Sequence, residues 1–173
     1  DFLAQQQRKT KAEQMLEALA KQESQKTSIR DALFAEIDKL NELWLREFNT
    51  IKVELDRVNA GHTALQIEPE FKGDKEAAVS FMQQLFRGSN IRETTLRAVM
   101  DDYADFGGLL RALPGALAKA GSTPEVFEKT FMHNLTEFVT WQVPNRFVIR
   151  YRGKELKHHS LGQRASALLL YVL

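Results

Sequence analysis

The sequence contains no cysteine, so disulfide bridges and zinc sites built from thiolates are excluded. No apolar run approaches the roughly 18 residues that a membrane-spanning helix needs, which predicts a chain without a membrane partner. Lysine and arginine number 24 against 23 aspartates and glutamates, and the formal net charge is +1. A charge this small provides no global field toward nucleic acid or an acidic surface. Together these absences favour a cytoplasmic protein.

Glycine and proline are missing from the whole N-terminal third, because the first glycine is Gly61 and the first proline is Pro69. Residues 1–60 are rich in Ala, Leu, Glu, Lys and Gln, a composition typical of long helices. Apolar side chains recur there at spacings of three and four, which predicts a helix that packs against another helix or a sheet. This seam consists of Leu33, Ile37, Leu40, Trp44, Phe48, Ile51, Leu55 and Val58.

A second start signal interrupts this helical pattern. Ser28 followed by Asp31 is similar to a capping box, which is compatible with a break near residues 26–28. The pattern leaves two alternatives open, one long helix or an antiparallel helical hairpin.

Residues 61–173 combine short strands with short helices. The alternation of Leu65, Ile67 and Phe71 predicts a strand within residues 63–71, and Pro69 favours an edge position. Asp74 is a suitable N-cap for a helix over residues 75–87. Further helices are predicted over residues 89–100, in short pieces over 101–120 around two Gly- and Pro-containing breaks, and over 123–138.

The last third of this segment predicts a β-hairpin. Residues 146–151 alternate, residues 152–154 form a turn, and a partner strand begins at Glu155. The expected fold class is therefore α+β, mainly helical, with a long helical arm at residues 1–60 and a small sheet with a helical insert at residues 61–173.

The C-terminal stretch is a polar loop with one glycine that leads directly into an apolar helix. The first helical turn is expected near residues 163–166. Unpaired backbone N–H groups and the positive end of the helix dipole then lie near residues 160–163. Such a loop suits an anion, most often a phosphate.

The sequence HSLGQRASALL at residues 159–169 resembles the signature motif of ABC-type ATPases of the SMC-like and RecF-like branch, including AAA-like members of bacterial DNA-processing and defence systems. In that family the motif's serine hydroxyl and glycine N–H bind the γ-phosphate of ATP held by the opposite protomer. Carried over by position, these residues are Ser160 and Gly162, and Gln163 and Arg164 support the loop. Two positions depart from the pattern, because His159 stands where leucine is usual and Leu161 stands where glycine or proline is usual.

The resemblance also implies an architecture and partners. Residues 1–60 would be a coiled-coil arm, and residues 61–173 would be part of the second ATPase lobe up to the signature. The intact protein would use ATP and Mg²⁺, dimerise through its ATPase heads, and act in DNA repair, DNA processing or defence against phage. DNA and a nuclease or PHP phosphoesterase would be its partners.

The same family also needs two motifs that this sequence lacks. A P-loop, GxxxxGK[ST], cradles the phosphates, and an acidic Walker B pair holds Mg²⁺ and water. Gly153-Lys154 is followed by Glu155, so it is no P-loop. We therefore expect an internal piece of a larger ATPase that has no catalytic residue of its own, binds no cofactor by itself and does not hydrolyse ATP alone.

Other chemistries find little support. His158 and His159 lack carboxylates at ligand spacing and there is no HExxH, so no metal site is predicted. No Ser-His-Asp, Cys-His or paired-carboxylate arrangement has motif support. Two other functions remain open. One is a non-catalytic coiled-coil adaptor in which Ser-Leu-Gly is only a helix cap, and the other is a helical nucleic-acid-binding module, which the low net charge disfavours.

Overall fold

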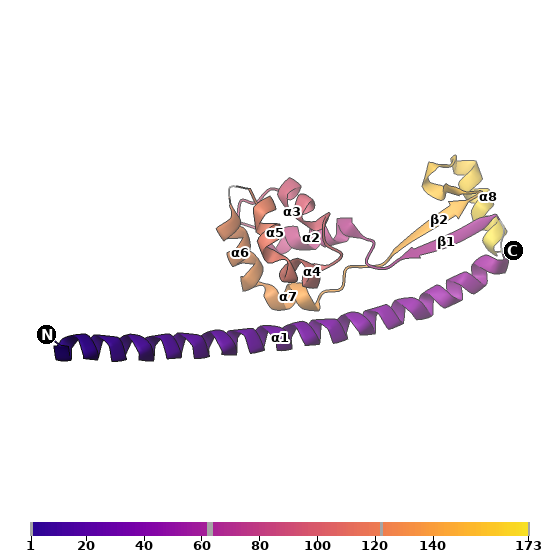
Figure 1. Ribbon diagram of the computed structural model, residues 1–173. Helices are drawn as coiled ribbons and strands as arrows, with labels where there is room; N and C mark the ends of the chain where they lie inside the picture. Colours follow the sequence, from indigo (N-terminus) through magenta and orange to yellow (C-terminus); the bar gives the residue numbers. More distant parts are fainter. Residues whose placement is uncertain (1, 62–63, 122, 173) are drawn as a thin grey trace. The chain divides into compact units, whose positions relative to one another are not determined.

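The computed structural model describes residues 2–61, 64–121 and 123–172. Within them the chain is mainly helical, with one small antiparallel sheet, which confirms the predicted α+β, mainly helical class at this level (Figure 1). None of the helices in these ranges is both long and apolar enough to cross a bilayer. By its internal contacts the chain divides into two units, residues 1–40 and residues 41–173.

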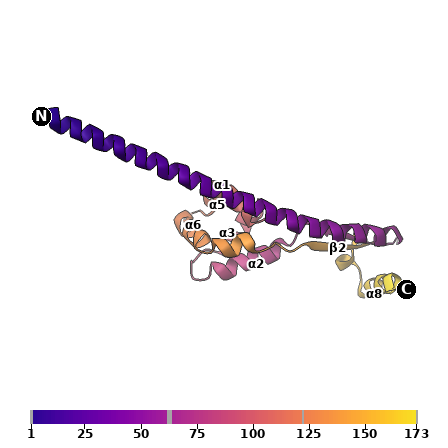
Figure 2. The same cartoon turned by 90° about the horizontal axis from the view of Figure 1, so that it is seen from below.

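The N-terminal helix α1, Phe2–Gly61, is a single element of 60 residues. At 1.5 Å per residue it is about 90 Å long. It continues through residues 26–28 without a break, so of the two alternatives left open by the sequence the structure has the single helix (Figure 1, Figure 2). Ser28 and Asp31 lie within the helix. The backbone N–H groups that a cap at Ser28 would bind are already bonded to carbonyls of the preceding helical turn. In residues 1–40, Met15, Leu16, Leu19 and Ile29 are exposed. The coiled-coil arm stays a prediction.

Six short helices of the second unit enclose the main core. They are α2 (Lys75–Leu85), α3 (Glu93–Met100), α4 (Phe106–Arg111), α5 (Leu113–Lys119), α6 (Pro124–His133) and α7 (Leu135–Thr140). Aromatic rings fill this core, and Phe138 lies 4.7 Å from Phe131 and 4.8 Å from Phe106 between ring centroids. The partly buried Trp141 packs against this core and stacks on Phe81 at 4.4 Å between ring centroids. These six helices, α2 to α7, are called the insert below, and they have a hydrophobic core of their own.

Several predicted boundaries in this block are wrong. The helix expected to be capped by Ser89-Asn90 begins only at Glu93 with Arg92 at the cap position, because Asn90 takes a positive φ of 60° that a right-handed helix excludes. Gly107 and Gly108 lie inside α4 and are no break. The helix expected over residues 123–138 is divided at Asn134, whose backbone leaves the helical region and whose side chain donates to the Thr130 carbonyl.

Asp74 behaves as predicted. Its carboxylate accepts a hydrogen bond of 3.0 Å from the Ala77 N–H and caps α2.

The sheet consists of β1 (Leu65–Glu70), β2 (Arg146–Tyr151) and β3 (Lys154–Glu155), in the order β1-β2-β3. β1 and β2 pair over their full length, whereas β3 pairs only with Arg150 and Tyr151. The predicted strand and hairpin are confirmed, with Pro69 on an edge strand. The partner strand is shorter than expected, because the chain turns into the 3-10 helix η1, Leu156–His158.

The outer edge of β1 is closed by the end of α1. The Asn59 side-chain amide donates to the Ile67 carbonyl and accepts from the Ile67 N–H, both at 2.9 Å. These groups face away from β2, so without Asn59 they would lack a protein partner. One side chain therefore fixes the sheet to the helix.

A buried lysine joins α1 to the insert. Lys72 is 4% exposed, and its ammonium donates to Asn41 of α1 and to the carboxylate of Asp105. The same ammonium lies 5.2 Å from the ring centroids of Trp44 and Phe71. The partners of Lys72 come from three segments, which are α1, the link that follows β1 and the start of α4. Lys72 therefore fixes the distances between these three segments.

Asp105 has two structural roles beside Lys72. Besides binding Lys72 it accepts a 2.7 Å hydrogen bond from the Gly108 N–H and so caps α4. Burial raises the pKa of Asp105, but the hydrogen bonds from Lys72 and Gly108 and the charges of Lys72 and Lys75 outweigh it. The pKa is therefore lower than usual.

We expect Lys72→Met to lower the free energy of unfolding by about 3 kcal/mol, because it leaves the partly buried Asp105 carboxylate without its counter-charge. Urea unfolding followed by circular dichroism measures the change. Lys154→Met, at an exposed lysine of β3, is the control and should stay within about 0.5 kcal/mol. A loss below about 1 kcal/mol for Lys72→Met would mean that the ion pair does not hold the unit together.

The lowered pKa of Asp105 predicts acid sensitivity. A carboxylate with a depressed folded pKa contributes stability that is complete above the unfolded value of about 3.9 and is lost as the pH falls through the folded value. The stability difference between the wild type and Asp105→Asn should therefore be largest near neutral pH and shrink below about pH 4. Urea unfolding at both pH values tests this. A difference that does not change with pH contradicts it.

Candidate signature loop

The candidate loop opens helix α8, Leu161–Val172. The helix begins at Leu161, about two residues before the predicted first turn, because Ser160 is a better cap than any later residue. Ser160 Oγ accepts from the Gln163 N–H at 3.4 Å, and Gln163 Oε1 accepts from the Ser160 N–H at 3.2 Å. This reciprocal pair is a capping box with glutamine in the acidic position.

The cap uses only part of the Ser160 hydroxyl. A hydroxyl carries one donor proton and two acceptor lone pairs, and the capping bond uses one lone pair. The Ser160 side chain is exposed, so its proton remains free to donate to a ligand.

Gly162 is a glycine that the fold does not require. Its φ is not positive, and a Cβ built on it would meet no atom within 4 Å. Glycine in a helix is less favourable than alanine by up to about 1 kcal/mol, so neither the backbone nor the packing explains it. Its N–H lies in the first turn, where intrahelical acceptors are missing. A glycine here leaves room for a ligand to approach the backbone closely.

His159, which departs from the family pattern, fixes the loop to the sheet. Its Nε2 lies 3.1 Å from the Tyr151 carbonyl oxygen, and its Nδ1 lies 3.3 Å from Gln163 Oε1. The ring also meets the Tyr151 ring edge to face at 5.5 Å. The sequence predicted no such role for His159. In the sequence, the only indication of this contact was the position of His159 directly before the cap residue Ser160.

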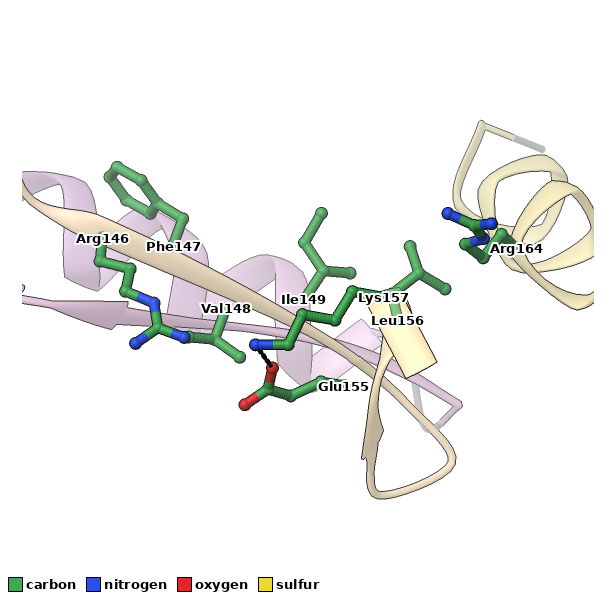
Figure 3. A pocket seen from close by; sticks show the side chains of 8 residues that line it. All are labelled: Arg146, Phe147, Val148, Ile149, Glu155, Leu156, Lys157 and Arg164. Carbon is green, nitrogen blue, oxygen red and sulfur yellow. Dashed lines mark ion pairs between the residues drawn. The ribbon is translucent and has the colours of Figure 1, made fainter. Parts of the chain in front are cut away.

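The four residues predicted to bind the phosphate, Ser160, Gly162, Gln163 and Arg164, lie together at the exposed start of α8. The Arg164 N–H donates to the Ser160 carbonyl at 2.9 Å. Its side chain forms no ion pair within the described part of the chain, and it lines a hollow beside β2 (Figure 3). The buried Ala167 packs with Leu65 and Tyr151 and anchors the other side of α8.

The histidines form no metal cluster in the part of the chain that the structure describes. His158 Nε2 lies 3.9 Å from Glu155 Oε2, and no group of three metal-ligating side chains gathers in the described ranges. His62 lies outside these ranges. A hydrogen bond from Lys157 lowers the pKa of Glu155, which matches a surface ion pair.

Because Gly162 has free space around it, Gly162→Ala should leave the free energy of unfolding unchanged or raise it by up to about 1 kcal/mol. Gly73→Ala is the contrasting control, since its Cβ would lie 2.7 Å from Glu70 Cβ and 2.8 Å from Arg146 Cβ. That crowding should lower the stability by about 1–3 kcal/mol. Urea unfolding compares the two variants. A clear destabilisation by Gly162→Ala would show that the fold itself needs this glycine.

Comparisons with known proteins do not identify the chain, because no protein-family model, no curated protein and no solved structure matches it significantly.

Proposed function

We propose that this chain is part of an SMC-like ABC-type ATPase and that the start of α8 binds the γ-phosphate of ATP held by a second protomer. The observation that carries the proposal is an exposed helix start with a free hydroxyl proton on Ser160 and a structurally dispensable glycine at position 162. A phosphate oxygen at this point can accept from the hydroxyl and from first-turn N–H groups, aided by the helix dipole.

In this proposal α1 belongs to the arm, and the sheet with its insert belongs to the second ATPase lobe. The P-loop, the Walker B pair and the bound Mg²⁺ are supplied by other segments, because the sequence carries neither motif. Closure of two heads over ATP would be stabilised by charge-assisted hydrogen bonds to the γ-phosphate and would end when that phosphate leaves. The proposed setting is DNA repair, DNA processing or defence against phage, with DNA and a nuclease or phosphoesterase as partners.

The competing function is a non-catalytic adaptor, and the capping box supports it. In that case the Ser160 hydroxyl acts only on the Gln163 N–H and has no ligand. The two functions differ in what they require at position 160. A cap needs any short acceptor side chain, whereas a phosphate contact needs a donor without negative charge.

Ser160→Asp separates the two functions, because aspartate caps a helix as well as serine but repels a phosphate. In the intact protein that contains this chain, we expect Ser160→Asp and Ser160→Ala both to abolish ATP-dependent head dimerisation and turnover while nucleotide binding to the P-loop persists. Light scattering, phosphate release and nucleotide titration measure the three quantities.

The exposed Ser166→Ala on the same helix is the matched control and should behave as the wild type. Full activity of Ser160→Asp would show that serine only caps α8 and would favour the adaptor. Gly162→Ala gives an independent check, because its methyl group should hinder the phosphate without affecting the fold.

A further inference from the structure

A hollow of about 540 Å³ lies on the insert, between the end of α2 and the outer face of α6. The end of α2 and the residues after it contribute Leu85 and Arg87. Helix α6 contributes Val126, Lys129, Thr130 and His133. Because these four residues have the spacing i, i+3, i+4 and i+7, they share one face of the helix. This place is called the α6 hollow below.

The basic side chains of the α6 hollow have no counter-charge in the described part of the chain. Arg87, Lys129 and His133 form no ion pair there. None of the described residues that line the hollow is acidic. Another cation of the insert is paired, since Arg97 binds the carboxylate of Glu76. The α6 hollow is therefore a place where unpaired basic side chains gather.

The ends of the two helices account for only part of this basic character. Carbonyl groups at a helix C-terminus favour a nearby cation by about 0.3–1 kcal/mol, and the effect fades within one turn. His133 is in the last turn of α6, and Arg87 follows the last residue of α2 by two positions. Lys129 lies before the last turn of α6, so the helix ends do not explain it.

Thr130 supplies a hydroxyl that the described chain does not use. A threonine in a helix often donates to the carbonyl four residues earlier, as Thr50 does to Arg46 at 3.0 Å. The Thr130 hydroxyl forms no hydrogen bond within the described residues. It is therefore free to donate to a group that enters the hollow.

The α6 hollow also has an apolar part. Val126 is 41% exposed although it is a large apolar residue. Leu85 is partly buried and packs against the hydrophobic core of the insert. An apolar group of a ligand would remove the exposed surface of these two side chains from water. The wall therefore suits a ligand that combines an apolar group with a negative charge.

A nucleic acid fits this combination poorly. Its phosphate backbone is uniformly negative and offers no aliphatic group to Val126. Glu125 and Glu128 are exposed on α6 outside the face that lines the hollow, and they would repel phosphates. Residues 75–140 as a whole carry seven Lys and Arg against eight Asp and Glu, so the insert provides no positive field. A protein segment with aliphatic and acidic side chains fits better.

The spacing of the wall favours a helical segment. Val126 lies one turn of α6 before Lys129 and Thr130, and His133 lies one turn after them. A helix of another protein that lies along α6 has the same rise of about 5.4 Å per turn. An aliphatic and an acidic side chain one turn apart on that helix therefore match these positions.

We propose that the α6 hollow is a docking site for an amphipathic helix of a partner protein, which presents an aliphatic and an acidic side chain one turn apart. The aliphatic side chain packs on Val126 and Leu85. The carboxylate binds the Lys129 ammonium and the Arg87 guanidinium and accepts from the Thr130 hydroxyl. The proposal does not depend on the nucleotide contact at α8.

The probe is a fluorescein-labelled, alanine-based helical peptide of about 16 residues, with leucine and glutamate four positions apart on one face. Fluorescence anisotropy with the full chain measures its affinity. We expect binding at least about tenfold tighter than that of the same peptide with lysine in place of glutamate. A peptide of the same composition with leucine and glutamate on opposite faces should also bind at least about tenfold more weakly. In amide chemical-shift mapping, the largest changes should fall on residues 85–87 and 126–133.

Lys129→Glu is the decisive variant. Lys129 is exposed, so the melting temperature should stay nearly unchanged while the affinity for the acidic peptide falls at least about tenfold. Arg92→Glu is the matched control and should bind as the wild type does. Arg92 is an exposed arginine between α2 and α3, outside the hollow and without an ion pair among the described residues. Thr130→Val keeps the shape of the side chain but removes the hydroxyl, and it should weaken binding about threefold to tenfold.

The proposal is overturned if the acidic peptide does not bind at millimolar concentration, or if Lys129→Glu binds it as tightly as the wild type. It is also overturned if the chemical-shift changes lie away from α6 and the end of α2. Tighter binding of a short duplex DNA that Lys129→Glu abolishes would overturn it in favour of a nucleic acid. Self-association of the chain that Lys129→Glu abolishes would overturn it in favour of a second copy.

Discussion

The buried ammonium of Lys72 is the constraint on which the arrangement of residues 41–173 depends. A buried charge is tolerated only where partners replace its water, and here a carboxylate, an amide and two aromatic rings do so. Moving any one of these partners would leave a charge without compensation. An apolar side chain could fill the same space, but it would not select a single position of α1 and α4. The ion pair therefore contributes specificity of arrangement as well as stability.

The same use of polar side chains recurs around the sheet. Asn59 closes one edge through the backbone of Ile67, and His159 ties the start of α8 to the carbonyl of Tyr151. Each contact satisfies a backbone group that water would otherwise have to reach. As a result, the loop at Ser160 is held from both ends, by His159 before it and by Ala167 after it. A small sheet with little core can thus position an exposed loop.

The sequence predicted those features whose causes are local. The cap at Asp74, the strand at residues 65–70 and the hairpin turn each depend on neighbours within a few residues. The contacts of Lys72 could not be predicted, because its partners Asn41 and Asp105 are 31 and 33 positions away in the sequence. The division at Asn134 also escaped prediction, since it depends on how the aromatic core is filled. At the candidate site, the motif pointed to Ser160 and Gly162, whereas the contacts of His159 required the tertiary structure.

Helix capping and phosphate binding are not alternatives at the level of atoms. The cap takes a lone pair of Ser160 and the N–H of Gln163, and it leaves the hydroxyl proton and the other first-turn N–H groups to a ligand. Capping accounts for the serine and the glutamine whether or not the loop binds a phosphate, so these two residues do not distinguish the two functions. It does not explain Gly162, which weakens the helix and fills no steric need. An anion that must approach the backbone closely does explain it, so the glycine is the stronger indication that this helix start has a ligand.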